Sequence, residues 1–192
     1  AEMPGLYAEK DYDLSGTIVG IVDKNKIVDG SKIEKGDVLI GFESNGLHTN
    51  GYSLARKVLF EKYTLDENIE ELNSNLKTEL LKVHKSYLNV IQNLISKSEV
   101  KAFSHITGGG IIGNTKRVVP NELKIKIDWN SWKVPEVFNL IQKTGEIEDD
   151  EMRMVFNMGI GLIAIVDKND VSNVEEICKK INENPIIIGE IE

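Results

Sequence analysis

The sequence predicts an α/β (α+β) fold in which a mixed sheet is flanked by helices. Short apolar runs of strand length alternate along the chain with longer segments whose apolar residues recur at the helical period. Two of these runs, 37–43 and 160–167, are apolar almost without interruption. Such runs are typical of strands that are buried on both faces of a sheet.

The first half of the chain predicts two strands and two helices. In order, these are a strand over 16–23 with a turn at 23–26, a strand over 37–43, a helix over 52–63, a polar irregular segment over 64–75 and a long helix over 76–97. The long helix rests on apolar residues that keep the helical period from Leu76 to Leu94. The charged, glycine-bearing stretch 34–36 is the predicted domain boundary, which leaves residues 1–34 in one domain and residues 35–192 in another.

The second half continues the alternation. It predicts strands over 100–104, 123–128, 160–167 and 185–191, and helices over 135–144, 149–155 and 172–182. Pro135 opens its helix and Gly145 closes it, as expected from the preference for proline at helix starts and glycine at helix ends. Ser172 and Glu175 have the spacing of a capping box.

The composition is that of a globular chain. Of the 192 residues, 41% are hydrophobic and 28% are charged, which is enough to bury a core without disulfides. The net charge of −8 argues against a nucleic-acid-binding protein, because such proteins neutralise phosphates with Lys and Arg. No apolar run approaches the ~20 residues of a membrane span, and the first residues do not form a signal peptide. We therefore expect a cytoplasmic protein that binds neither nucleic acid nor a membrane.

Three glycine-bearing loops are the candidate functional segments. Loop 44–51 (SNGLHTNG) precedes a helix, where backbone amides favour an anion, although a tight turn capped by Asn50 explains the same residues. Loop 104–110 (SHITGGG) allows a ligand to approach the backbone closely, with a flexible loop as the alternative. In 156–161 (FNMGIG), close packing of the glycines is the favoured interpretation.

Other reactive residues give weaker indications. His84 falls inside the predicted long helix and is interpreted as a surface or packing residue, and Trp129 and Trp132 are interpreted as packing or interface residues. Cys178 is the only cysteine, so it can form no intrachain disulfide, and it is expected to be buried. No two histidines stand at i, i+4 spacing and no Gly-x-Ser-x-Gly motif occurs, so neither a structural zinc site nor a serine hydrolase is expected.

Taken together, the motifs resemble those of phosphoribosylformylglycinamidine cyclo-ligase, also called aminoimidazole ribonucleotide synthetase. The matching stretches are 1–7 (AEMPGLY), 29–33 (DGSKI), 36–41 (GDVLIG), 44–54 (SNGLHTNGYSL), 105–110 (HITGGG) and 156–161 (FNMGIG). They occur in order over essentially the whole chain. Thr49 stands where serine is more usual in the family, which is a mild departure.

The resemblance implies an activity and a set of ligands. The family uses ATP to close formylglycinamidine ribonucleotide to aminoimidazole ribonucleotide, with release of ADP and phosphate, in de novo purine biosynthesis. It implies ATP and Mg²⁺ as cofactors, a small-molecule substrate and a homodimer. The alternatives are a non-catalytic nucleotide- or phosphate-binding module, or a related ATP-using enzyme such as selenophosphate synthetase or thiamine monophosphate kinase.

The matching motifs also imply roles for individual residues. His48 and Asn50 are expected in or near catalysis, and no residue is assigned to a metal. The residues expected to bind substrate or nucleotide are Glu2, Ser44, Gly46, Thr49, Gly51, His105, Thr107, Gly108, Gly109, Gly110, Asn157 and Gly159.

The family's chain is much longer than this one. By resemblance, residues 1–34 are the tail of an N-terminal domain that binds ATP and forms the dimer, and residues 35–192 are the C-terminal domain of the aminoimidazole ribonucleotide synthetase superfamily. We expect ATP and Mg²⁺ to bind largely through the missing N-terminal part, so that this chain alone is inactive.

Overall fold

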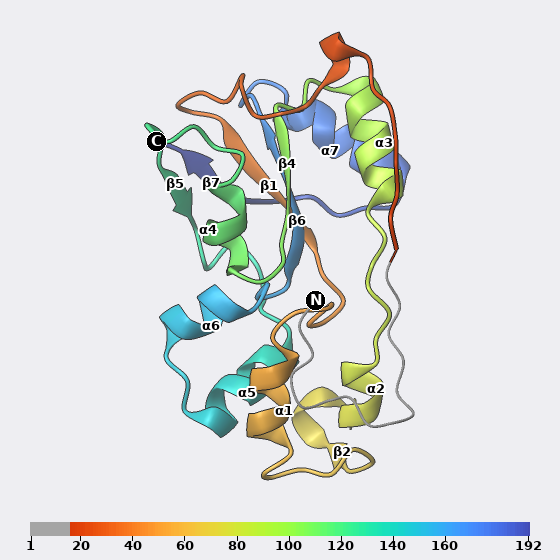
Figure 1. The fold of residues 1–192 in the computed structure, drawn as a ribbon, viewed down its shortest axis with the longest axis vertical. Coiled ribbons are helices and arrows are strands. Elements are labelled where there is room, and N and C mark those ends of the chain that lie inside the picture. Colours follow the sequence, from red (N-terminus) through yellow and green to blue (C-terminus); the bar gives the residue numbers. More distant parts are fainter. Residues whose placement is uncertain (1–15) are drawn as a thin grey trace.

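The computed structural model describes residues 16–192, and its main element is a five-stranded sheet of order β4-β6-β1-β7-β5 (Figure 1). Its strands are β1 (Val38–Glu43), β4 (Ala102–His105), β5 (Ile125–Ile127), β6 (Ile160–Val166) and β7 (Ile186–Ile191). The α+β class with flanking helices is confirmed. Every pairing within this sheet is antiparallel, however, so its strand directions are not mixed as expected.

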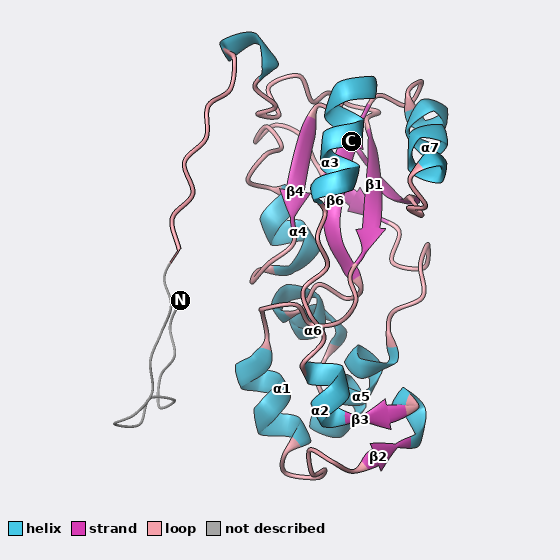
Figure 2. Cartoon of the chain, turned by 90° about the vertical axis from the view of Figure 1, so that its right-hand side faces the viewer, coloured by secondary structure: helices cyan, strands magenta, loops and turns pink. Residues whose placement is uncertain are grey.

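Helices cover both faces of the two central strands, β1 and β6. On one face, α3 (Leu88–Lys97) and α7 (Val171–Lys180) pack on Phe42 and its neighbours (Figure 2). On the other face, α4 (Gly110–Thr115) packs on Leu39 and Ile163. All residues of β6 are buried, which confirms the strand predicted to be buried on both faces.

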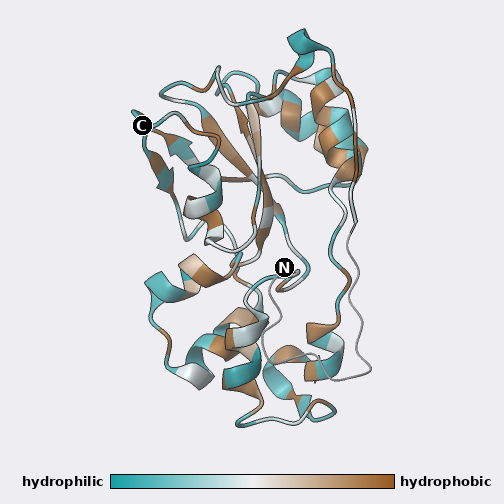
Figure 3. Ribbon diagram, in the orientation of Figure 1, coloured by the Kyte–Doolittle hydropathy of each residue, from teal (hydrophilic) through white to brown (hydrophobic). Residues whose placement is uncertain are grey.

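A second group of elements lies below the sheet in Figure 1 and has its own apolar core. It comprises α1 (Tyr52–Leu59), α2 (Leu76–Leu80), α5 (Glu136–Gly145), α6 (Asp149–Val155) and the hairpin of β2 (Asn68–Ile69) and β3 (Ser74–Asn75). Figure 3 shows hydrophobic residues along the central strands, as expected for a sheet that packs against helices on both faces.

The predicted strand over 16–23 is wrong. Residues 16–22 have no regular structure, and Ile18, Val19 and Ile21 are almost fully exposed; a short 3-10 turn, η1 (Lys24–Lys26), follows. A strand is stabilised by its neighbours, and no strand of residues 16–192 pairs with this segment.

The predicted long helix over 76–97 is also wrong. Within 76–97 the chain is helical only in α2 and α3, and residues 82–87 between them have no regular structure. Apolar residues of α2 pack into the lower core while those of α3 pack on the sheet, so one straight helix cannot serve both. Two hydrogen bonds tie the linker to the end of β1 and the loop after it: Tyr87 Oη donates to the carbonyl of Glu43 (3.0 Å), and Asn45 Nδ2 donates to that of Val83 (2.6 Å).

Two smaller differences concern helix starts. The helix expected at Ser172 begins at Val171, and no side chain caps it, so the capping box is not formed. The second half of the expected loop 104–110 leads into α4, which was not predicted. Between residues 16 and 192, none of the helices combines the length and apolar character needed to cross a bilayer.

Candidate functional site

His48 lies in the loop between β1 and α1 and is held by that loop. Its side chain is 5% exposed and its backbone has a φ of 59°, in the left-handed region. Its Nε2 atom lies 2.9 Å from Oδ1 and 3.3 Å from the backbone nitrogen of Asn45. Its Nδ1 atom is buried and has no hydrogen-bond partner among the described residues. The imidazole is therefore fixed on one side and unsatisfied on the other.

Two more histidines lie beside His48. The ring of His84 stacks on that of His48, with 3.9 Å between centroids and 24° between planes. The Nε2 atoms of His84 and His105 are 3.4 Å apart. These are the only histidines of the chain, and they come from the β1–α1 loop, the α2–α3 linker and the end of β4.

His84 was missed by the sequence prediction because it was placed inside a continuous helix. The apolar period runs from Leu76 through Val83 to Leu94, so periodicity gave no break. The one available signal was the low helix propensity of Val83, His84 and Ser86.

Burial and neighbouring charges set the protonation of His48. Its pKa is lowered to about 4, mainly by burial and in smaller part by His84, His105 and Lys85. Burial and His84 also lower the pKa of His105. Burial raises the pKa of Tyr87, and its hydroxyl serves as a hydrogen-bond donor to Glu43. His48 is thus neutral at pH 7, with one of its two ring nitrogens unprotonated.

The loop that contains three consecutive glycines is organised by a buried asparagine. Asn114 Nδ2 donates to the carbonyls of Thr107 (3.1 Å) and Gly110 (2.8 Å), and its Oδ1 accepts from Thr107 Oγ1 (2.9 Å). Gly108 and Gly109 are exposed, whereas Gly110 is buried against the carbonyl of Arg153. Asn114 carried no sequence signal, because its role depends on a loop that closes around it.

The loops at 44–51 and 105–110 meet. A methyl group added to Gly108 would lie 3.5 Å from Oδ1 of Asn50. Together with the contacts among the three histidines, this brings His48, Asn50, His105 and Gly108 to one place. Thr49 is exposed nearby.

Other residues expected to bind substrate lie inside the protein. Asn157 is buried and hydrogen-bonds with Ser44 Oγ and with the carbonyl of Gly46. Its Oδ1 also accepts from the backbone N–H of Gly159. Gly51, the half-buried residue just before α1, is in close contact with the ring of Phe156. These residues hold the loop before His48 in place, while Glu2 lies outside the described residues.

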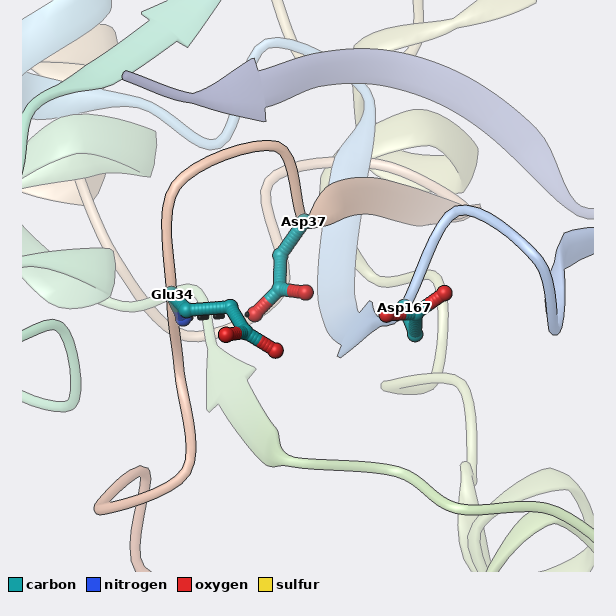
Figure 4. Close-up of side chains that lie close together, drawn as sticks. All are labelled: Glu34, Asp37 and Asp167. Atoms are coloured by element: carbon teal, nitrogen blue, oxygen red, sulfur yellow. Dashed lines mark hydrogen bonds between the residues drawn. The ribbon is translucent and has the colours of Figure 1, made fainter.

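A group of acidic residues lies at the opposite end of β1. Glu34, Asp37 and Asp167 approach one another there (Figure 4). The Lys101 ammonium lies 2.6 Å from Asp37 and 2.8 Å from Glu34. Burial alone would lower the pKa of Lys101, but these hydrogen bonds outweigh it and raise the pKa. Lys101 thus pairs with two of the three carboxylates, and the group forms an ion-pair network.

The fold and the convergent loops define a class of domain. Residues 34–192 match the family model described as AIR synthase related protein, C-terminal domain. The chain belongs to this family.

Its relatives make the comparison more specific. The phosphoribosylformylglycinamidine cyclo-ligase of Syntrophus aciditrophicus (strain SB) is 45% identical, covering 100% of this chain and 56% of the relative. That of Thermoanaerobacter sp. (strain X514) is 47% identical, covering 100% and 57%. The chain therefore spans little more than half the length of these relatives.

One solved structure shows the same fold in a more distant protein. Thiamine-monophosphate kinase from Stenotrophomonas maltophilia K279a superimposes with a TM-score of 0.56 at 13% identity, covering 88% of this chain and 52% of that one.

Proposed function

We propose that this chain is the C-terminal part of an enzyme that uses ATP to close formylglycinamidine ribonucleotide to aminoimidazole ribonucleotide, releasing ADP and phosphate, in purine biosynthesis. The observation that carries the proposal is the meeting of two family motifs. His48 and Asn50 come from one motif and Gly108 from the other, and they lie together in a chain that belongs to this family.

His48 is assigned to proton transfer. In the reaction, ATP phosphorylates the formyl oxygen, the amidine nitrogen attacks the formyl carbon, and the oxygen leaves as phosphate. The attacking nitrogen must lose a proton. A neutral imidazole has one unprotonated nitrogen, which is the group that takes up this proton in the proposal.

The neighbouring loops are assigned to substrate binding. Asn50, Thr49 and the exposed backbone of Gly108 and Gly109 contact the ribonucleotide, with Thr107 held in place by Asn114. A second set of residues is assigned to the site because it holds these loops in position. It consists of Ser44, Gly46, Gly51, Gly110, Asn157 and Gly159. Glu2 is assigned to the nucleotide by its motif alone.

ATP and Mg²⁺ are assigned largely to a part of the enzyme outside this chain. In the acidic group, Lys101 pairs with Asp37 and Glu34, and we assign no metal to it. Residues 1–34 are assigned to the tail of an ATP-binding, dimer-forming domain and residues 35–192 to the C-terminal domain. The greater length of the relatives and the exposed apolar side chains at 18–22 support this division. The whole enzyme is proposed to be a cytoplasmic homodimer.

The test joins this chain to the preceding part of the Syntrophus relative and measures ADP release. We expect release only when ATP and formylglycinamidine ribonucleotide are both present, and none from the 192-residue chain alone. His48→Ala should lower the rate about 10²–10⁴-fold, while exposed Asn173→Ala should not change it.

Three results would argue against the proposal. ADP release driven by thiamine monophosphate instead would favour a related kinase. Binding of the ribonucleotide without turnover in the joined protein would favour a binding module. ADP release by this chain alone would show that the ATP site is wrongly assigned.

A further inference from the structure

The contact between His84 and His105 has unusual geometry for a hydrogen bond. Their Nε2 atoms are 3.4 Å apart, beyond the roughly 2.7–3.2 Å of ordinary protein hydrogen bonds. Their ring centroids are 5.3 Å apart. Two imidazoles bound to one tetrahedral ion through bonds of about 2.0–2.1 Å would have nitrogens about 3.3 Å apart and centroids about 5 Å apart. The distances between His84 and His105 are closer to those of two imidazoles on one metal ion than to those of a hydrogen-bonded pair.

The surroundings suit an ion with nitrogen ligands. His105 is exposed and His84 is half-buried, so water and an ion can reach both. The nearby ammonium of Lys85 is paired with Glu183 at 2.9 Å, which reduces its repulsion of a cation. Imidazole ligands favour Zn²⁺, Co²⁺, Ni²⁺ and Cu²⁺ over Mg²⁺ and Ca²⁺, which prefer oxygen.

His48 supports the pair without joining it. Its ring stacks on His84, so its own nitrogens lie in a separate, nearly parallel plane. Its Nε2 is engaged with Asn45, and its Nδ1 is buried. No third His, Cys, Asp or Glu of residues 16–192 groups with His84 and His105, so the remaining positions of a tetrahedral ion would take water or an oxygen of a bound molecule.

We propose that His84 and His105 form a binding site for a divalent transition-metal ion of the Zn²⁺ type, with positions open to water. The site is independent of the Mg²⁺ expected with ATP, and it does not rest on the proposed function. Its ligands come from the α2–α3 linker and from β4, so no histidine spacing in the sequence indicates it.

The test titrates the 192-residue chain with Zn²⁺ in a calorimeter. We expect one ion per chain, with Mg²⁺ failing to compete. His84→Ala and His105→Ala should each weaken binding at least about tenfold, since each removes one of two ligands. Asp167→Asn is the matched control, because it alters the acidic group at the other end of β1, and it should leave Zn²⁺ binding unchanged.

A spectroscopic readout on the unmodified chain guards against variants that fail to fold. Long-range ¹H–¹⁵N spectra resolve the ring nitrogens, and the chain has only three histidines. Zn²⁺ should shift the Nε2 signals of His84 and His105 strongly and those of His48 weakly. The proposal is overturned if the spectra do not change, if His48 alone shifts, or if a His84→Ala/His105→Ala double variant binds Zn²⁺ as tightly as the parent.

Discussion

Asn157 offers the sharpest test of how the site is held together. Its side chain is 4% exposed and makes four hydrogen bonds. Nδ2 donates to the carbonyls of Gly46 (2.9 Å) and Leu47 (3.3 Å). Oδ1 accepts from Ser44 Oγ (2.9 Å) and from the N–H of Gly159 (2.8 Å). One amide thus ties the loop before His48 to the start of β6.

The cost of Asn157→Ala follows from these bonds. Once Asn157 is removed, the Ser44 hydroxyl can donate to the carbonyl of Gly46, but the buried N–H of Gly159 loses its side-chain acceptor. A lost hydrogen bond costs about 1 kcal/mol, and an unsatisfied buried donor costs about 1–3 kcal/mol. We expect the free energy of unfolding to fall by about 3 kcal/mol in total, which corresponds to a Tm lower by about 6–12 °C for a chain of this size.

The assay is thermal and urea unfolding followed by circular dichroism. The control is Asn173→Ala, whose amide also donates to a backbone carbonyl, that of Lys97, but in an exposed position where water can replace it. The control should stay within about 0.5 kcal/mol of the parent. If Asn157→Ala is equally mild, the network does not hold the loop and the reasoning fails.

Three further predictions concern the same region and the core. Gly161→Ala should lower the free energy of unfolding by about 2 kcal/mol, because the added methyl would overlap the Tyr87 hydroxyl and lie 2.8 Å from His48 Cε1. Gly113→Ala, in open space within α4, should be neutral or slightly stabilising. Equal free energies of unfolding for the two variants would contradict this. Burial lowers the pKa of His48 from 6.5 to about 4, so between these pH values the unfolded chain binds a proton that the folded chain does not. The free energy of unfolding should therefore fall by up to roughly 3 kcal/mol as the pH drops from 6.5 to about 4. Unfolding is measured as a function of pH with a chelator present. The loss of stability that comes from His48 should appear in the parent chain and not in His48→Asn. Burial raises the pKa of Cys178 to about 11, so iodoacetamide should label it at neutral pH only in denaturant, and rapid labelling of the folded chain would count against its burial.

The elements predicted correctly are those whose signal is local. The unbroken apolar runs of β1 and β6 indicate burial on both faces, whichever strands lie beside them. The helix over 149–155 was predicted from its acidic first turn, and α6 has those bounds. The directions of the strands were not predictable in this way, since an antiparallel pair and a parallel pair can use the same apolar residues.

The errors arise where two candidate packings share one pattern. Leu76 and Leu94 fit a single helix by period, yet one belongs to the lower core and the other to the face of the sheet. The 16–23 segment has the composition of a strand, but no strand of the described residues pairs with it. In both cases the sequence pattern predicts that a residue is buried or that a strand is paired. It does not indicate which element the residue or strand packs against.

The histidine cluster shows why this matters for function. His48 and His105 were found through motifs, each within one loop, but their relation to His84 depends on the helix ending at Leu80. A continuous helix would have carried His84 along the line from α2 to α3, with its backbone hydrogen bonds satisfied internally. The break instead leaves an irregular linker that hydrogen bonds of Tyr87 and Asn45 hold against the end of β1, and His84 in this linker stacks on His48. The helix break and the site are therefore one structural feature, so a sequence prediction that misses the first also misses the second.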